Sequence, residues 1–212
     1  MANISKLISG FRVFKSTTFE RQKDIIRHLI EQGHKPTTMV ISCAEIRMAP
    51  AEIFATNPGE LYVINNIGGL VPKYDKHGTH GILSAIEYAV TILEVENIII
   101  LGHAKCEGIK MMMSDKFSSG KNLSESMKTW LSVAQDAKEA VKSQLGDKSE
   151  EEQLKACEHE SIVISLRNLI EYPYVAKRIQ ENKLNIFGWH FNAERGALLG
   201  FNVDNGFFEP IS

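Results

Sequence analysis

The sequence predicts an α/β fold: a central, mainly parallel sheet with a C-terminal antiparallel strand, flanked by helices. Short apolar runs indicate buried strands, and amphipathic helical segments separate several of them along the chain. Strands that alternate with helices form parallel sheets through right-handed crossovers. The expected strands span residues 38–42, 61–64, 97–101, 184–187 and 197–203.

The helices are expected from apolar spacing and from capping residues. Thr17 to Glu20 matches a capping box, and Gly33 would end the helix that this box starts. Residues 81–93 and 123–145 carry helical apolar patterns, and Ser149 is placed to cap a further long helix. The last two expected strands are joined by a short turn, which predicts an antiparallel hairpin.

Composition narrows the class of protein. The 212 residues suffice for one substantial core, and a net charge of −2 lacks the basic excess typical of nucleic-acid binders. No apolar run is long enough to span a membrane, and the N-terminus lacks a signal-peptide pattern. Three cysteines argue against a disulfide framework and for a reducing compartment or metal ligation. We therefore expect a cytoplasmic protein that binds neither nucleic acid nor membrane.

Three potential metal ligands follow two of the expected strands. Cys43 lies at the carboxyl end of the first, and His103 lies just past the third. Proteins with parallel sheets bind small molecules and ions beyond the carboxyl ends of the strands. Cys43 and His103 would meet at that edge if their two strands are neighbours. Cys106 follows three residues after His103 and opens an expected helix, whose N-terminus favours a thiolate. Cysteine and histidine are preferred zinc ligands, and three protein ligands leave one position open.

Two other interpretations of these three residues stay open from their spacing alone. They could be unrelated buried side chains that never meet. They could also form a purely structural zinc site, which would need a fourth protein ligand.

The segments around these residues resemble the β-carbonic anhydrase family. That family carries Cys-x-Asp-Ser-Arg after its first strand and His-x-x-Cys-Gly after its third. This sequence has Cys43-Ala44-Glu45-Ile46-Arg47 and His103-Ala104-Lys105-Cys106-Glu107-Gly108 at the two places. Residues 58–63, 85–90 and 187–191 are similar to further segments of the family, and the resemblance spans about residues 20 to 203.

The resemblance implies a zinc enzyme for the reversible hydration of carbon dioxide to bicarbonate, with Cys43, His103 and Cys106 as the Zn²⁺ ligands. In the family an Asp–Arg pair manages the water at the zinc, and the resemblance gives that role to Glu45 and Arg47. It also implies at least a homodimer. Residues 1–33 would form an N-terminal helical arm over the partner, and residues 34–212 a single zinc-binding domain.

Three positions depart from the family pattern: Glu45 replaces its Asp, Ile46 its Ser, and Glu107 the Gly after the second Cys. Glu45 can pair with Arg47, or its extra methylene can bring it to the zinc as a fourth ligand. We expect ligation, because Ile46 and Glu107 also depart from the active pattern, and we therefore expect weak or conditional activity. Glu107 is either a site residue or an exposed residue of a first helical turn.

Two further functions stay open beside carbon dioxide hydration. A non-catalytic relative would bind zinc and keep the fold without the chemistry. A hydrolase would act on carbonyl sulfide or a similar small linear molecule.

Other polar residues carry weaker expectations. Cys157 and His159 are two positions apart in a helical segment, so they point to different faces, and we expect Cys157 in the core and His159 on the surface. His34 and His80 are candidate proton-relay residues, because a histidine can titrate near neutral pH.

Overall fold

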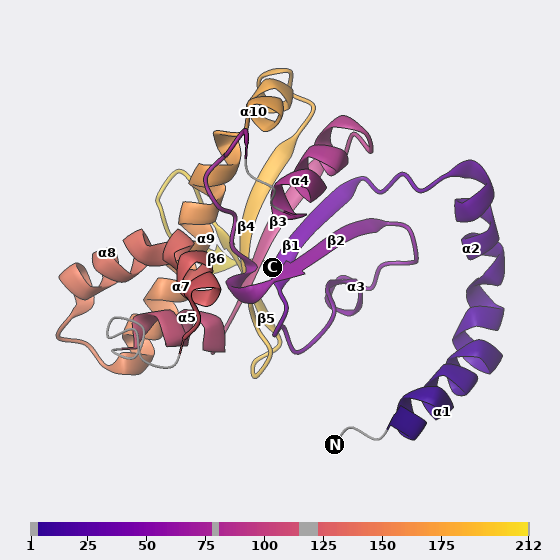
Figure 1. Ribbon diagram of the computed structural model, residues 1–212, viewed down its shortest axis with the longest axis horizontal. Coiled ribbons are helices and arrows are strands. Elements are labelled where there is room, and N and C mark those ends of the chain that lie inside the picture. Colours follow the sequence, from indigo (N-terminus) through magenta and orange to yellow (C-terminus); the bar gives the residue numbers. More distant parts are fainter. Residues whose placement is uncertain (1–3, 78–80, 115–122, 212) are drawn as a thin grey trace.

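A computed structural model describes residues 4–77, 81–114 and 123–211 and contains one six-stranded sheet (Figure 1). The strand order is β2-β1-β3-β4-β5-β6. The first four strands run parallel, and β5 runs antiparallel to them, as expected. A further short strand, β6, pairs antiparallel with β5 and so has the direction of the first four. The strands are β1 Thr38–Cys43, β2 Leu61–Asn66, β3 Asn97–His103, β4 Asn185–Asn192, β5 Ala197–Phe201 and β6 Phe208–Pro210.

The burial of each strand follows from its position in the sheet. In β1 and β3 every residue after the first is buried, as expected for central parallel strands covered on both faces. Strand β2, at the edge, has no buried residue and alternates between half-buried and exposed positions over its second half. The apolar run at residues 61–64 was expected to be a buried strand, and this expectation is wrong because β2 has a neighbouring strand on one side only.

Helices lie toward both ends of the sheet, and the N-terminal helices extend away from it (Figure 1). The expected helix over residues 123–145 is broken by a 3₁₀ turn at Ser132–Ala134, and the capping box at Ser149 is present. None of the described helices is long and apolar enough to cross a membrane. The helices are α1 Ile4–Phe14, α2 Glu20–Gln32, α3 Pro50–Ile53, α4 Gly81–Thr91, α5 Glu107–Met113, α7 Glu125–Leu131, α8 Gln135–Leu145, α9 Glu150–Ile170 and α10 Pro173–Gln180.

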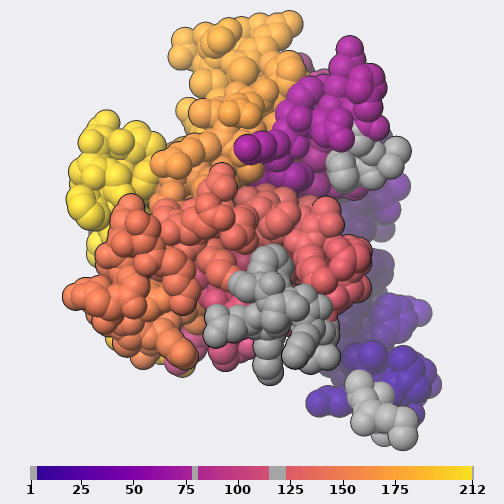
Figure 2. Space-filling view, turned by 60° about the vertical axis from the view of Figure 1, so that its left-hand side comes forward, coloured from indigo at the N-terminus to yellow at the C-terminus, as the bar shows by residue number. Residues whose placement is uncertain are grey.

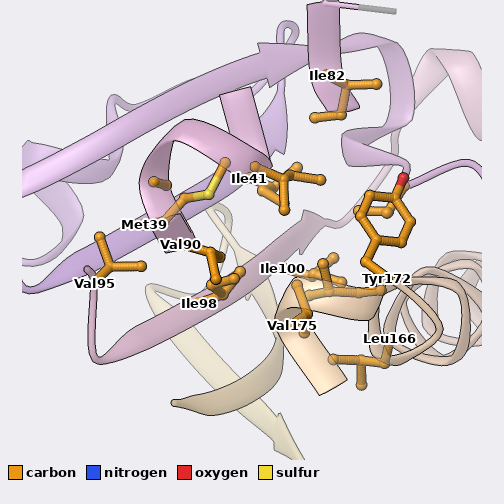
Figure 3. Close-up of a cluster of buried hydrophobic side chains, with 14 of the residues drawn as sticks. Met39, Ile41, Ile82, Val90, Val95, Ile98, Ile100, Leu166, Tyr172 and Val175 are labelled. Atoms are coloured by element: carbon orange, nitrogen blue, oxygen red, sulfur yellow. The ribbon is translucent and has the colours of Figure 1, made fainter. Parts of the chain in front are cut away.

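The main core lies between one face of the sheet and helices α4, α9 and α10 (Figure 3). Its members are fully or almost fully buried, and burial of each large aliphatic side chain contributes about 1.5–3 kcal/mol. Tyr172 is also buried, and its hydroxyl donates a hydrogen bond to the Pro72 carbonyl at 2.9 Å. This core fixes the strands whose carboxyl ends carry the candidate ligands. It includes Met39, Ile41, Ile82, Val90, Ile98, Ile100, Leu166 and Val175.

The N-terminal segment is one helical rod that extends away from the sheet (Figure 1). It ends at Gly33, as expected, where φ is +87°. The expected capping box at Thr17 is wrong, because Thr17 lies inside the rod and its hydroxyl donates to the Val13 carbonyl at 2.7 Å. A threonine satisfied by the preceding turn does not start a new helix. No residue of α1 or α2 is buried, and the rod lies along one side of the molecule in Figure 2.

His159 is half-buried, whereas the sequence suggested a surface residue, and Cys157 is buried as expected. The His159 ring stacks on Phe208 with centroids 4.2 Å apart and lies edge-on to His190 at 4.6 Å. Burial, with the neighbouring His190, lowers the pKa of His159 to about 3. The expectation was wrong because Phe208 of β6 and His190 of β4 pack against α9, and helical spacing does not encode these long-range contacts.

The lowered pKa of His159 predicts a loss of stability in mild acid. The ordinary histidine pKa is 6.5, so between about pH 6.5 and 3 the unfolded chain binds a proton that the folded chain does not. His159→Phe keeps an aromatic ring against Phe208 and removes this titration. The unfolding free energy of the wild-type protein should fall between pH 7 and pH 5, and in His159→Phe this fall should be smaller by about 1–2 kcal/mol. Urea denaturation at the two pH values measures the difference. The exposed His34→Gln is the control, and an equal effect in both variants would contradict the assignment.

Candidate metal centre

The sheet brings Cys43 and His103 to one rim. Strands β1 and β3 are adjacent and parallel, with Ser42 paired to Leu101, so both strands end at the same edge. Cys43 is the last residue of β1 and His103 the last of β3. Two residues 60 positions apart therefore become neighbours through strand pairing, as the sequence predicted. Cys43 is fully buried and His103 is 4% exposed.

Cys106 reaches the same point through a tight turn. The Ala104 N–H donates to the Phe191 carbonyl at 2.9 Å, which ties the start of the turn to β4. Lys105 has φ of +56°, a conformation that costs a non-glycine residue free energy and that recurs at functional sites. Helix α5 begins directly after Cys106. The turn thus reverses the chain within three residues and returns Cys106 to the rim.

The side chains of these residues form a group that could hold a metal ion. The Sγ atoms of Cys43 and Cys106 are 3.8 Å apart. Each of these two, a nitrogen of His103 and a carboxylate oxygen of Glu45 lies within 4.8 Å of the others. Among the described residues, His103 Nε2 is buried without a hydrogen-bond partner, which is costly unless another group binds it. Two thiols and an orphaned imidazole nitrogen at this separation fit Zn²⁺.

The two thiols share a polar environment that favours one thiolate. A hydrogen bond from Cys106 lowers the pKa of Cys43, and the backbone N–H groups of Glu45 and Gly68 also donate to its Sγ, at 3.4 and 3.3 Å. The same contact with Cys43 raises the pKa of Cys106. A dication between the sulfurs would offset their mutual repulsion, because its charge stabilises both thiolates.

The Arg47 guanidinium contacts the turn that carries His103. Its Nη1 lies 2.9 Å from His103 Nδ1, and its Nη2 donates to the Lys105 carbonyl at 3.1 Å. His103 Nδ1 also lies 3.0 Å from the Ala104 carbonyl. The two neighbours favour opposite tautomers, because Arg47 only donates and the Ala104 carbonyl only accepts. The tautomer with its proton on Nδ1 donates to Ala104 and leaves the lone pair on Nε2, from which it would bind a metal.

Glu45 is held by two donors. Its Oε1 accepts from Arg47 Nη2 at 3.1 Å, and its Oε2 accepts from the Glu107 N–H at 2.9 Å. The structure therefore has Glu45 in the paired arrangement, one of the two that the sequence left open. Ligation of the metal by Glu45 stays a prediction.

The other two departures from the family pattern have separate locations. Ile46 is half-buried and packs on the apolar cluster of Val40, Ile99, Leu101 and Phe191, so its bulk serves packing. The Glu107 side chain is exposed and pairs with Lys110 Nζ at 3.3 Å. Glu107 contributes its backbone N–H to the site, and its carboxylate does not contact Glu45 or the candidate ligands in the hydrogen bonds described.

The candidate relay histidines do not join this group. His34 is exposed and precedes β1, so it lies at the opposite end of that strand from Cys43. His80 lies outside the described residues.

Two contributors to the site were not predicted from the sequence. Gly68 supplies an N–H to the Cys43 sulfur from a turn in which its φ is +83°, and the Gly68-Gly69 pair after the second strand was the available signal. Glu158, in α9, accepts the Cys106 N–H at 3.0 Å. It is 52 residues distant, and no local pattern distinguishes it from the other glutamates of its helix.

Fold and site together define an α/β protein with two thiols and an imidazole at adjacent strand ends. The sequence profile of the family described as carbonic anhydrase matches residues 38–198. Beta carbonic anhydrase 3 of Arabidopsis thaliana is 34% identical over 201 residues, which cover 95% of this chain and 78% of that protein.

Solved structures give the same answer for the fold. The β-carbonic anhydrase CcaA superposes with a TM-score of 0.92 at 27% identity, over 99% of this chain and 92% of that chain. A tetrameric β-carbonic anhydrase of Sordaria macrospora superposes with a TM-score of 0.82 at 22% identity, over 94% and 96% of the two chains. The chain belongs to the β-carbonic anhydrase family. The fold class and the family resemblance predicted from the sequence are confirmed.

Proposed function

We propose that this chain is a zinc-dependent carbonic anhydrase that interconverts carbon dioxide and bicarbonate. The observation that carries the proposal is the group of Cys43, His103 and Cys106 beside the Glu45–Arg47 pair, in a chain of this family. The two cysteines and His103 would hold Zn²⁺. The ion, when bound, would supply a water acidic enough to act as a nucleophile near neutral pH.

The surrounding residues would orient the reacting water. The Glu45 carboxylate, fixed by Arg47 and by the Glu107 N–H, offers an oxygen to accept a hydrogen bond from that water. A fixed acceptor directs the lone pair of the water toward the carbon of carbon dioxide. Arg47 also holds the carbonyls of Ala104 and Lys105, so the ligand turn keeps its shape during the reaction.

Glu45 would control the strength of the activity. Both of its oxygens have donors in the structure, which supports the paired state. One of them also lies within 4.8 Å of the other three donor atoms, so a modest side-chain movement would bring it to the ion. Occupation of the open position would exclude the reacting water. We therefore keep the proposal of a weak or conditional activity.

The chain would act as a homodimer or larger homo-oligomer, in which residues 1–33 are an arm on the partner and residues 34–212 a single zinc-binding domain. The support is the apolar face of α1, whose large side chains are 42–65% exposed in the single chain. Such a face on a soluble protein needs a partner surface. Cytoplasmic location also stays a prediction. The exposed residues include Ile4, Leu7, Ile8, Phe11 and Phe14.

Removal of one thiol tests the metal and the reaction together. Cys106→Ala is expected to lose bound zinc and at least tenfold of carbon dioxide hydration, because second-sphere changes alone cost about 10–100-fold. Elemental analysis and stopped-flow hydration measure the two effects. Cys157→Ala, at a buried cysteine outside the group, is the control and should keep both. Full zinc content in Cys106→Ala would refute the ligand set.

The same assays separate the other functions. Wild-type protein that holds zinc but does not hydrate carbon dioxide would be the non-catalytic relative. Turnover of carbonyl sulfide without hydration of carbon dioxide would instead identify the hydrolase.

The reach of Glu45 predicts the effect of shortening it. Glu45→Asp keeps a carboxylate near Arg47 and removes the methylene that favours ligation, so hydration at neutral pH should rise several-fold at unchanged zinc content. Stopped-flow rates across pH check this. Glu107→Asp is the control, since its carboxylate faces Lys110. A lower rate in Glu45→Asp would show that the longer carboxylate suits the reaction and would remove the case for weak activity.

Because the apolar face of α1 is exposed in the single chain, we expect formation of the homo-oligomer to depend on this face. Phe11→Glu places a charge within that face and should reduce the mass measured by light scattering at micromolar concentration. Ser9→Glu adds the same charge outside the apolar set and should leave the mass unchanged. An unchanged mass in Phe11→Glu would contradict the arm.

A further inference from the structure

A buried carboxylate lies directly behind the candidate metal site. Glu158 is 4% exposed, and its Oε1 accepts the backbone N–H of Cys106, which is 2% exposed, at 3.0 Å. A buried carboxylate is retained only where its oxygens have donors, because desolvation of an unpaired charge is costly. The hydrogen bond from the Cys106 N–H therefore offsets part of the cost of burying the Glu158 carboxylate.

The second oxygen of Glu158 contacts His190. His190 Nε2 lies 3.2 Å from Glu158 Oε2, and the ring is 2% exposed. Either atom of this contact can carry the shared proton, and Nδ1 of the same ring is buried without a hydrogen-bond partner among the described residues. His190 is paired in the sheet with Gly102, which directly precedes the ligand His103. The start of the ligand turn is thus paired with the backbone of His190, and its end is bonded to the Glu158 side chain.

Two half-buried aromatic rings pack beside His190. His159 lies edge-on to His190, and Phe208 stacks on His159. This packing keeps the carboxylate in a region of low dielectric, where hydrogen bonds are stronger and an unpaired group costs more. The Glu158–His190 contact is consequently a rigid link between α9, β4 and the turn that carries Cys106.

We propose that Glu158 and His190 are positioning residues for the metal site, which hold Cys106 in its ligating position before the ion binds and thereby set metal affinity. The inference rests on the proposed zinc site, but it does not depend on which reaction that site catalyses. The Cys106 Sγ would lie 3.8 Å from the Cys43 Sγ because its backbone is fixed at the N–H. Outer partners of metal ligands commonly change affinity in this way.

The test compares zinc affinity in three variants of the full chain. Glu158→Ala removes the acceptor of the Cys106 N–H and should weaken zinc binding about 10–100-fold, measured by competition with a chromogenic chelator. Glu158→Gln keeps an acceptor oxygen for Cys106, and its amide N–H can donate to His190 Nε2 when the imidazole proton lies on Nδ1, so its affinity should stay within about threefold of wild type. This rescue would show that geometry, and not the charge, sets the affinity.

Asn168→Ala is the matched structural control. Asn168 is buried in the same helix, and its side chain donates to the Val71 carbonyl at 2.8 Å, away from the ligand turn. It should lower the melting temperature and leave zinc affinity unchanged. If Glu158→Ala does not fold, His190→Phe removes the second partner of Glu158 and should give an intermediate loss of affinity.

The outcomes separate this inference from the proposed function. Wild-type affinity in Glu158→Ala or His190→Phe, or an equal loss in Asn168→Ala, would overturn the positioning role. Zinc binding that depends on Glu158, in a protein that does not hydrate carbon dioxide, would support the inference and refute the function. Absence of zinc binding in the wild-type protein would overturn both.

Discussion

The site depends on one constraint, the parallel pairing of β1 with β3. Parallel strands that are direct neighbours end at the same edge, so Cys43 and His103 meet without any loop to join them. The apolar runs that bury both strands make this pairing stable, and the core in Figure 3 holds them against the helices. Loss of that register would separate a thiol from an imidazole that must lie within a few ångströms to bind one ion.

Around this rim the chain fixes its ligands mainly through backbone groups. Arg47 donates hydrogen bonds to the carbonyls of Ala104 and Lys105. The Gly68 N–H donates to the Cys43 sulfur, and the Glu158 carboxylate accepts from the Cys106 N–H. Contacts to the backbone restrict each ligand at its Cα, which leaves the side chains little freedom. This arrangement explains how the donor atoms lie close together.

Much of the fold and of the site was predictable from the sequence for a physical reason. Central strands are buried on both faces, so the sequences of β1 and β3 are mainly apolar. Cys43 and His103 are the last residues of these two strands. Residues that act across the sheet were not predictable. Glu158 resembles any helical glutamate, and the burial of His159 depends on β6, which is three residues long and has no period to detect.

The start of the helix before Gly33 was predicted incorrectly from the sequence. Thr17 carries a capping sequence, yet its hydroxyl bonds to Val13 and the helix continues through it. Local hydrogen-bonding options compete, and the sequence does not say which one the chain uses.

X-ray absorption spectroscopy of the zinc-loaded protein tests the central claim most directly. The account predicts two sulfur ligands at about 2.3 Å and at least one nitrogen at about 2.0–2.1 Å, from Cys43, Cys106 and His103. Loss of one sulfur in Cys106→Ala should follow. A zinc shell with fewer than two sulfurs in the wild-type protein would show that the two strand ends do not form the metal site.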